Sequence, residues 1–262
     1  MTNLSSQQML KYAYLQLASE ATGLVDGLEG ERLADVLTVG NSRASVFTRT
    51  EANTFVSDGW TVVAHVEKNS GFSGTLFKDK AGNLVLSFRS TEFADDAVRD
   101  NQQTNKTEIR NHGWAFGQIA DMEAWYAGLL RDPDALGAGQ RFAVTGYSLG
   151  GHLATAFDIM RHEDGTSGRI TEVFTFNGAG VGQTQSSLSL HTVIDTFSAA
   201  RVDGSNAASF GTSVAANLYA QMSAQMNGAA TVEVADGFIG QINAAVTQLS
   251  TSDPGTHRSC GS

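Results

Sequence analysis

Apolar and polar positions follow two different periods along the chain, one typical of strands and one of helices. Residues 60–67, 74–79 and 84–90 are rich in β-branched and aromatic residues, and polar turn residues separate the last two runs. This spacing predicts an antiparallel entry into a sheet. In residues 114–130 apolar side chains recur at helical spacing, and residues 1–20 form a similar amphipathic pattern, so both segments are predicted to be helices.

The second half of the chain alternates between the two patterns. Residues 141–160 predict a strand, a glycine-rich turn and a helix, and further strands are expected at 172–180 and 191–199. Such alternation favours the α/β class, with a mostly parallel central sheet flanked by helices. Residues 28–57 mix glycines with charges and give no assignment. Residues 205–250 predict helices that serve either as scaffold or as a mobile cap.

Composition and charge limit the classes of partner. At 262 residues the chain is expected to form a single domain spanning 1–262. The net charge is -10 and no run of Lys or Arg is present, so nucleic acid is an unfavourable partner. Cys260 is the single cysteine, which excludes an internal disulfide and a zinc site built from thiolates. We therefore expect no metal in the site.

The chain has no pattern of membrane insertion. No apolar run reaches the roughly 18 residues that a spanning helix needs, so we expect a soluble protein without a transmembrane segment. The first 20 residues lack the basic start and uninterrupted apolar run of a Sec signal peptide. Cytoplasmic location and signal-peptide-independent export both remain open, and peripheral contact with a lipid surface is compatible with either.

The strongest chemical signal is a G-x-S-x-G motif centred on Ser148, with Gly146 and Gly150 on either side. It follows an apolar strand and precedes a helix, which is the setting in which such a serine is a nucleophile exposed at a sharp turn. The helix N-terminus then faces the negative charge that develops during attack. The motif in this context predicts nucleophilic catalysis by Ser148 in an α/β-hydrolase fold.

A serine nucleophile needs a histidine base and an acid that orients it. In this fold the order along the chain is serine, acid, histidine. His257 fits as the base, whereas His191 has no suitable acid between itself and Ser148. Asp203 is favoured as the acid because it follows a predicted strand, and Asp195 is the alternative.

Three motifs together resemble the class 3 lipase family of the α/β-hydrolase superfamily, including its bacterial lipase-like domains. They are the elbow GYSLGGHLA, the strand end SFRSTE and the helix entry NHGW. The resemblance implies an oxyanion hole formed by the N–H groups of Thr91 and Leu149, a structural role for His112, and a lid at about 92–111. Ser90 stands where the family usually has glycine.

The sequence therefore predicts a serine-dependent carboxylic ester hydrolase, a lipase or phospholipase acting on a lipid or small ester through Ser148, His257 and Asp203. The charged lid favours a smaller or more polar ester. No cofactor is expected. The acidic loop with Asp95, Asp96 and Asp100 offers oxygen ligands for a structural calcium, but a solvated run of exposed charges is the favoured interpretation. The alternatives are an amidase or thioesterase with the same triad, a phospholipase effector, and a non-catalytic binding module.

Overall fold

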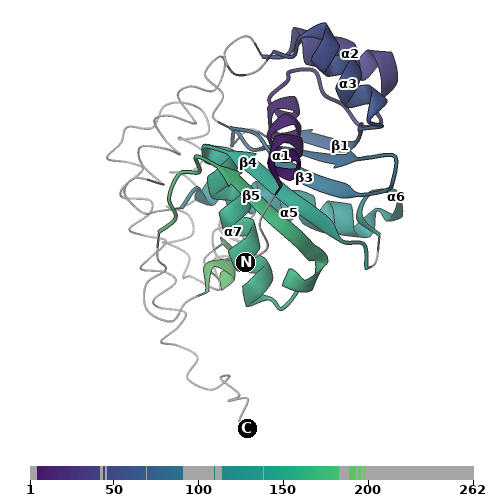
Figure 1. Ribbon diagram of the computed structural model, residues 1–262. Coiled ribbons are helices and arrows are strands. Elements are labelled where there is room, and N and C mark those ends of the chain that lie inside the picture. The colour runs from purple at the N-terminus through teal and green to yellow at the C-terminus, as the bar shows by residue number, and fades with distance from the viewer. Residues whose placement is uncertain are drawn as a thin grey trace, which may run out of the picture.

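A five-stranded sheet with helices on both faces forms the centre of the molecule (Figure 1). The computed structural model describes residues 5–182 apart from 42, 43, 45, 69, 91–108, 110–113 and 138, together with residues 189–192, 194, 195 and 198. The strands are β1 (Thr61–Glu67), β2 (Ser73–Lys78), β3 (Leu84–Phe88), β4 (Phe142–Tyr147) and β5 (Ile170–Phe176). The helices are α1 (Ser6–Ser19), α2 (Gly30–Val39), α3 (Arg49–Ser57), α5 (Phe116–Arg131), α6 (Pro133–Leu136) and α7 (Leu149–Glu163), with a 3-10 turn η2 (Ser167–Arg169).

The strands lie side by side in chain order, and the sheet is mixed. β1 with β2 and β2 with β3 are antiparallel, as the sequence predicts for this entry, whereas β3 with β4 and β4 with β5 are parallel. The α/β class is confirmed, but the prediction of a mostly parallel sheet is wrong for the described strands. The reason is the length of the connections. Short turns join β1 to β2 and β2 to β3, whereas the connections through α5 and α7 are long enough for a parallel crossover.

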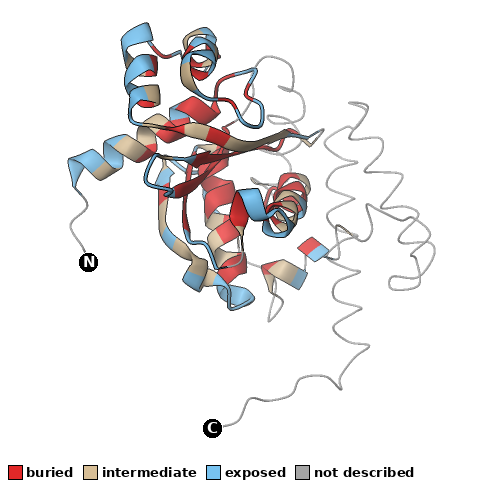
Figure 2. Cartoon of the chain, turned by 90° about the vertical axis from the view of Figure 1, so that its right-hand side faces the viewer, coloured by how far each residue is buried: buried red, intermediate tan, exposed pale blue. Residues whose placement is uncertain are grey.

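Each face of the sheet has its own apolar layer. Leu15 of α1 packs with Phe77 and Val85 on one face, in a cluster that also takes in α2 and α3. Leu76 and Leu86 point to the opposite face and pack with residues of α5 and α7. Figure 2 shows buried residues where the helices meet the strands. Because β3, β4 and β5 run in the same direction, their carboxyl ends meet at one edge.

The segment left unassigned from sequence holds α2 and α3. A capping box starts α3: the Glu51 N–H donates to Thr48 Oγ1 at 3.2 Å, and the Thr48 N–H donates to Glu51 Oε2 at 2.8 Å. This reciprocal pair satisfies two N–H groups at the helix start. The T-x-x-E pattern is therefore the sequence signal for this helix.

The strand expected at 191–199 is wrong, since the described residues at 190–192, 194, 195 and 198 are helical. Ser189 Oγ accepts from the Thr192 N–H at 3.1 Å, as an N-cap serine does. Leu190 and Ile194 are both 1% exposed, and their four-residue spacing places them on one helix face in the core. The β-branched residues that suggested a strand are thus overridden by a cap and by burial.

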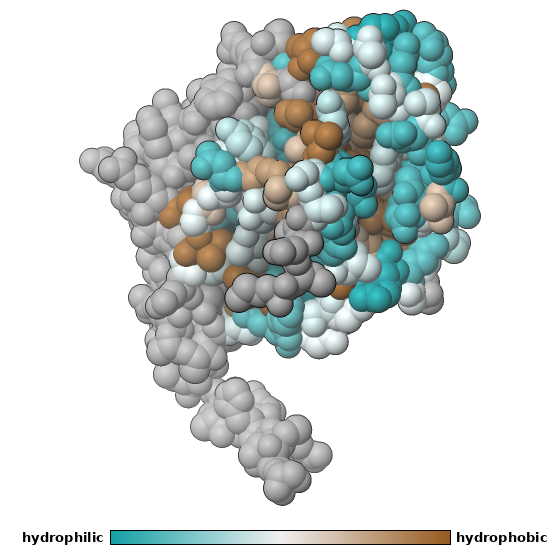
Figure 3. All heavy atoms as spheres, viewed as in Figure 1, coloured by the Kyte–Doolittle hydropathy of each residue, from teal (hydrophilic) through white to brown (hydrophobic). Residues whose placement is uncertain are grey.

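The outer surface mixes apolar and polar residues. Large exposed apolar side chains include Met9, Leu10 and Leu17 of α1. Figure 3 shows apolar residues interspersed with hydrophilic ones on the face turned to the viewer. Among the described helices, none combines the length and apolar character needed to cross a membrane.

Candidate active site

Ser148 occupies the turn between β4 and α7 in a backbone conformation that is rare for its residue type. Its φ is 52° and its ψ is -114°, and among the described residues only Asn177 is another non-glycine with positive φ. Such a conformation costs about 1–3 kcal/mol and persists only where the surroundings enforce it. The strain is thus an observed feature of this serine, as expected for a nucleophile presented on a sharp turn.

Main-chain hydrogen bonds hold the turn in place on both sides. The Ser148 N–H donates to the Phe176 carbonyl at 3.0 Å, at the end of the neighbouring strand β5. The Ser148 carbonyl accepts from the N–H groups of His152 at 3.1 Å and Ala179 at 3.0 Å. Both backbone groups of Ser148 are therefore paired, and the half-buried side chain stands where β4 meets α7.

The glycines around Ser148 are required by close backbone packing. A Cβ on Gly146 would lie 2.1 Å from the Gly150 carbonyl oxygen, and one on Gly150 would lie 2.1 Å from the Phe88 carbonyl oxygen. A Cβ on Gly151 would lie 2.7 Å from the Cα of Gly178. The end of β3 and the loop after β5 therefore press directly on the first turn of α7.

Leu149, one of the two predicted oxyanion donors, is the first residue of α7. An N–H group at this position lies outside the intrahelical hydrogen-bond ladder and points away from the helix at its positive end. The Leu149 side chain is buried, which anchors the helix start against the core. The geometry thus offers one main-chain donor directly after the serine.

His152 lies one turn along α7 from Ser148 and is fully buried. Its Nε2 accepts from the Ala115 N–H at 3.2 Å, so its Nδ1 carries the proton donated to the Gly180 carbonyl at 3.0 Å. Burial lowers the pKa of His152, outweighing contacts with the backbone at Gly180 and Ala179 that raise it. This neutral ring joins the start of α5 to the loop after β5. Sequence reasoning did not assign it that role.

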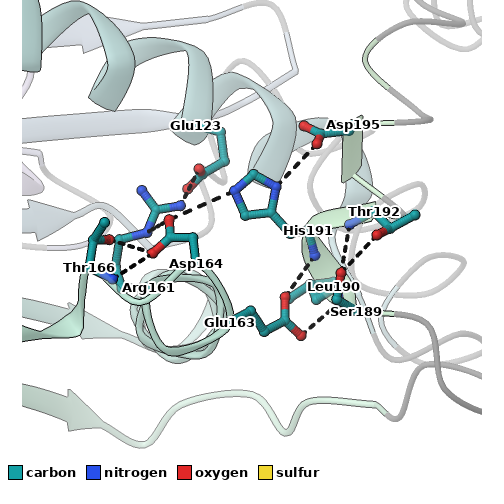
Figure 4. A network of polar contacts seen from close by, with 10 residues as sticks. All are labelled: Glu123, Arg161, Glu163, Asp164, Thr166, Ser189, Leu190, His191, Thr192 and Asp195. Carbon is teal, nitrogen blue, oxygen red and sulfur yellow. Dashed lines mark hydrogen bonds and ion pairs between the residues drawn. The ribbon is translucent and has the colours of Figure 1, made fainter. Parts of the chain in front are cut away.

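The alternative acid Asp195 and the rejected base His191 pair with each other at the other end of α7 (Figure 4). His191 Nδ1 lies 3.2 Å from Asp195 Oδ2, and its Nε2 lies 3.8 Å from Asp164 Oδ2 at the α7 C-cap. Since α7 has 15 residues and begins directly after Ser148, about 22 Å separates its two ends. Neither His191 nor Asp195 is near the serine.

Charged side chains, of which Arg161 is buried, surround that His191–Asp195 pair. Arg161, 4% exposed, bridges Glu123 of α5 and Asp164. Burial raises the pKa of Glu123, and the Arg161 guanidinium opposes that shift. Glu163 accepts from the N–H groups of Leu190 and His191, both at 2.9 Å. Figure 4 shows these side chains clustered around the helical turn at 189–195. The arrangement anchors this turn to the end of α7.

Several predicted site residues lie outside the described part of the chain. They are Thr91, Asp203 and His257 of the proposed machinery, the structural His112, and the acidic trio Asp95, Asp96 and Asp100. The same holds for 205–250 and for the candidate lid at 92–111 except Ile109, which packs against the core. The structure therefore places Ser148 and Leu149 at the turn between β4 and α7, and the roles assigned to these and to the other residues stay predictions.

Among the residues that the structure describes, neither a metal-binding cluster nor one of the two pockets given next includes Ser148. Within the described ranges, no group of three or more His, Cys, Asp or Glu side chains is arranged to hold a metal ion. A pocket of about 320 Å³ lies between α1 and α3, and one of about 370 Å³ lies beside β1 and α5. Ser148 lines neither of them.

Comparisons with protein-family models, with curated proteins and with solved structures found no match to this chain.

Proposed function

We propose that this chain is a serine-dependent carboxylic ester hydrolase with Ser148 as its nucleophile. The observation that carries the proposal is the positive φ of Ser148 between β4 and α7, enforced by three glycines whose Cβ positions are filled by backbone. A strained serine at the carboxyl edge of a sheet, followed at once by a helix N-terminus, suits attack on a carbonyl carbon.

The proposed reaction is acyl transfer to water. Ser148 Oγ attacks the ester carbonyl while His257 takes its proton, and the N–H groups of Leu149 and Thr91 stabilise the oxyanion. His257 then protonates the leaving alcohol as the carbon–oxygen bond breaks, which leaves an acyl-serine. Water then attacks the acyl-serine carbonyl while His257 takes its proton, and His257 returns this proton to Ser148 Oγ as the bond to the acyl group breaks and the acid leaves. Asp203 orients His257 and stabilises its positive charge. No cofactor takes part in these steps.

The described histidines support His257 as the base by being engaged elsewhere. Both ring nitrogens of His152 are hydrogen-bonded, and His191 sits at the far end of α7. His65 on β1 contacts Thr75 Oγ1 through Nδ1 at 2.9 Å, and His162 is exposed at the end of α7, 14 residues after the serine. Asp195 pairs with His191 at that far end of α7, which argues against Asp195 as the acid, so the proposal keeps Asp203 in that role.

A chain-length panel of p-nitrophenyl esters, from acetate to palmitate, tests the proposal and begins to define the substrate. We expect wild type to hydrolyse one range of the panel, and Ser148→Ala to lower kcat by about a thousandfold or more. Ser57→Ala, which removes an exposed hydroxyl on α3, is the matched control and should keep wild-type kcat. Preference for long chains would indicate a lipase, and for short chains an esterase. Wild-type inactivity across the panel would contradict the proposal.

A further inference from the structure

Glu20 is a buried carboxylate that binds the end of β3 through two hydrogen bonds. It is the C-cap residue of α1 and is 2% exposed. Its Oε1 accepts from the Ser90 N–H at 2.9 Å, and its Oε2 accepts from Ser90 Oγ at 2.9 Å. Gln16, one turn earlier on α1, also donates to Glu20 Oε1. Three donors therefore converge on one carboxylate, and two of them belong to Ser90.

The buried charge at Glu20 is costly by itself, and its contacts compensate for part of that cost. Burial raises the pKa of Glu20, while the two bonds from Ser90, the nearby Arg89 guanidinium and Gln16 act in the opposite direction. A buried carboxylate with one donor removed leaves an expensive unsatisfied group. The pairing of Glu20 with Ser90 is thus strongly preferred over any arrangement that separates them.

Ser90 lies beside the serine turn. Phe88 pairs with Gly146 in the parallel ladder, and a Cβ on Gly150 would lie 2.1 Å from the Phe88 carbonyl oxygen and 2.9 Å from that of Arg89. The backbone immediately before Ser90 therefore touches the first turn of α7. A shift of Ser90 would be transmitted to the place where Ser148 and Leu149 act.

Neighbouring contacts on the same face of the sheet reinforce this strand end. Ser87 Oγ donates to Ser19 Oγ of α1 at 2.9 Å, and Arg89 Nη1 donates to Glu67 Oε1 at 2.6 Å. Ser87 is thus hydrogen-bonded to α1 and Arg89 to β1. Glu20 adds two further hydrogen bonds at Ser90, the next residue along the chain.

We propose that Glu20 is a positioning residue for the hydrolysis: it fixes Ser90, and with it the end of β3 that packs against the first turn of α7, where Ser148 and Leu149 act. This inference rests on the proposed function. Because the Ser90 N–H is already donated to Glu20, it is unavailable to the oxyanion. Ser90, at the position where the class 3 lipase family usually has glycine, donates the second hydrogen bond to Glu20 through its hydroxyl group.

The test compares Glu20→Ala with Glu123→Ala, which removes a partly buried carboxylate that pairs with Arg161 toward the C-terminal end of α7. Kinetics on the best p-nitrophenyl ester are combined with inhibition by an aryl trifluoromethyl ketone, which forms an oxyanion adduct with the nucleophile. For Glu20→Ala we expect kcat to fall about 30-fold to 100-fold with KM little changed, since a misplaced oxyanion donor acts on the transition state. The inhibition constant should rise by a similar factor. Glu20→Gln, which keeps the volume and one acceptor, should recover most of the loss.

Glu123→Ala should lower stability but leave kcat per folded enzyme and the inhibition constant unchanged. If Glu20→Ala keeps wild-type kcat, or loses activity only in proportion to folded protein, the positioning role is overturned. If Glu20→Ala does not fold, Ser90→Gly is the second variant, because it removes only the hydrogen bond from Ser90 Oγ to Glu20. It must lower kcat about threefold or more and raise the inhibition constant of the ketone by a similar factor. Unchanged values of both would overturn the inference. An inactive wild type would instead contradict the proposed function itself.

Discussion

Ser148 can hold its positive φ because three neighbouring positions have no side chain. The backbone of β3, α7 and the loop after β5 fills the space that Cβ atoms of Gly146, Gly150 and Gly151 would take. The G-x-S-x-G motif between a predicted strand and a predicted helix indicated a sharp turn at Ser148, and the contacts that hold this turn lie within a few residues of the motif or on adjacent strands. At this scale the sequence indicated the turn at Ser148, and the catalytic roles of Ser148 and Leu149 stay predictions.

Gly150→Ala should destabilise the fold by about 3 kcal/mol or more, because the new Cβ would meet the Phe88 carbonyl oxygen at 2.1 Å and backbone would have to move. Gly128→Ala is the matched control: no atom lies within 4 Å of its Cβ position in α5. It should stabilise the protein by about 0.5–1 kcal/mol. Urea unfolding of both variants measures this. Equal stability of the two variants would show that Gly150 is not held by this contact.

His152 predicts a pH dependence of stability. Burial lowers its folded pKa below the value of 6.5 that it has when unfolded, so the unfolded chain binds the proton first as pH falls. The stabilisation is complete above that value and is lost as pH falls from there through the folded pKa, at up to about 1.4 kcal/mol per pH unit. Urea unfolding of wild type and His152→Gln at several pH values between 5 and 8 measures the difference.

The control for that series is His162→Gln, which changes an exposed ring at the end of α7. It leaves His152 in place and should therefore keep the loss of stability at low pH that His152 produces. The stability advantage of wild type over His152→Gln should shrink below pH 6.5. A constant advantage across the range would mean that His152 does not titrate differently in the two states.

At the scale of elements, local patterns predicted the strands of the first hairpin, the β4–α7 unit and α5. They failed where an interaction from a distant residue decides the conformation. Residues 190–195 have strand-like composition, yet Glu163 accepts from the N–H groups of Leu190 and His191 and stabilises a helical turn. In contrast, α3 could have been predicted from Thr48 and Glu51, because its capping box is local.

Asp195 and Asp203 are predicted to differ in their effect on hydrolysis. Asp195→Asn should leave kcat within about twofold of wild type, because Asp195 pairs with His191 some 20 Å or more along α7 from Ser148. Asp203→Asn should lower kcat by about a thousandfold or more, as expected for the acid of a triad. Steady-state ester hydrolysis by both variants measures this. The assignments of the acids would have to be exchanged if Asp195→Asn were the inactive variant.

At the scale of the whole molecule, the sequence predicted the α/β class but overestimated the parallel content of the sheet. Turns that join β1 to β2 and β2 to β3 make this half antiparallel, and crossovers through α5 and α7 make the other half parallel. The triad partners pose a harder problem, because Asp203 and His257 lie 55 and 109 residues beyond Ser148. No local periodicity specifies which distant side chains meet. The prediction of Asp203 and His257 as triad partners therefore depends on their order along the chain and on the expected position of Asp203 in a loop after a strand.

Labelling with a fluorophosphonate probe, followed by mass spectrometry of the digested protein, tests the nucleophile most directly because it requires no knowledge of the natural ester. We predict one probe per chain, attached to Ser148, no labelling of Ser148→Ala, and slow labelling of His257→Ala. Wild-type labelling at a different residue, or no labelling of folded wild type at all, would contradict the assignment of Ser148 as an activated nucleophile.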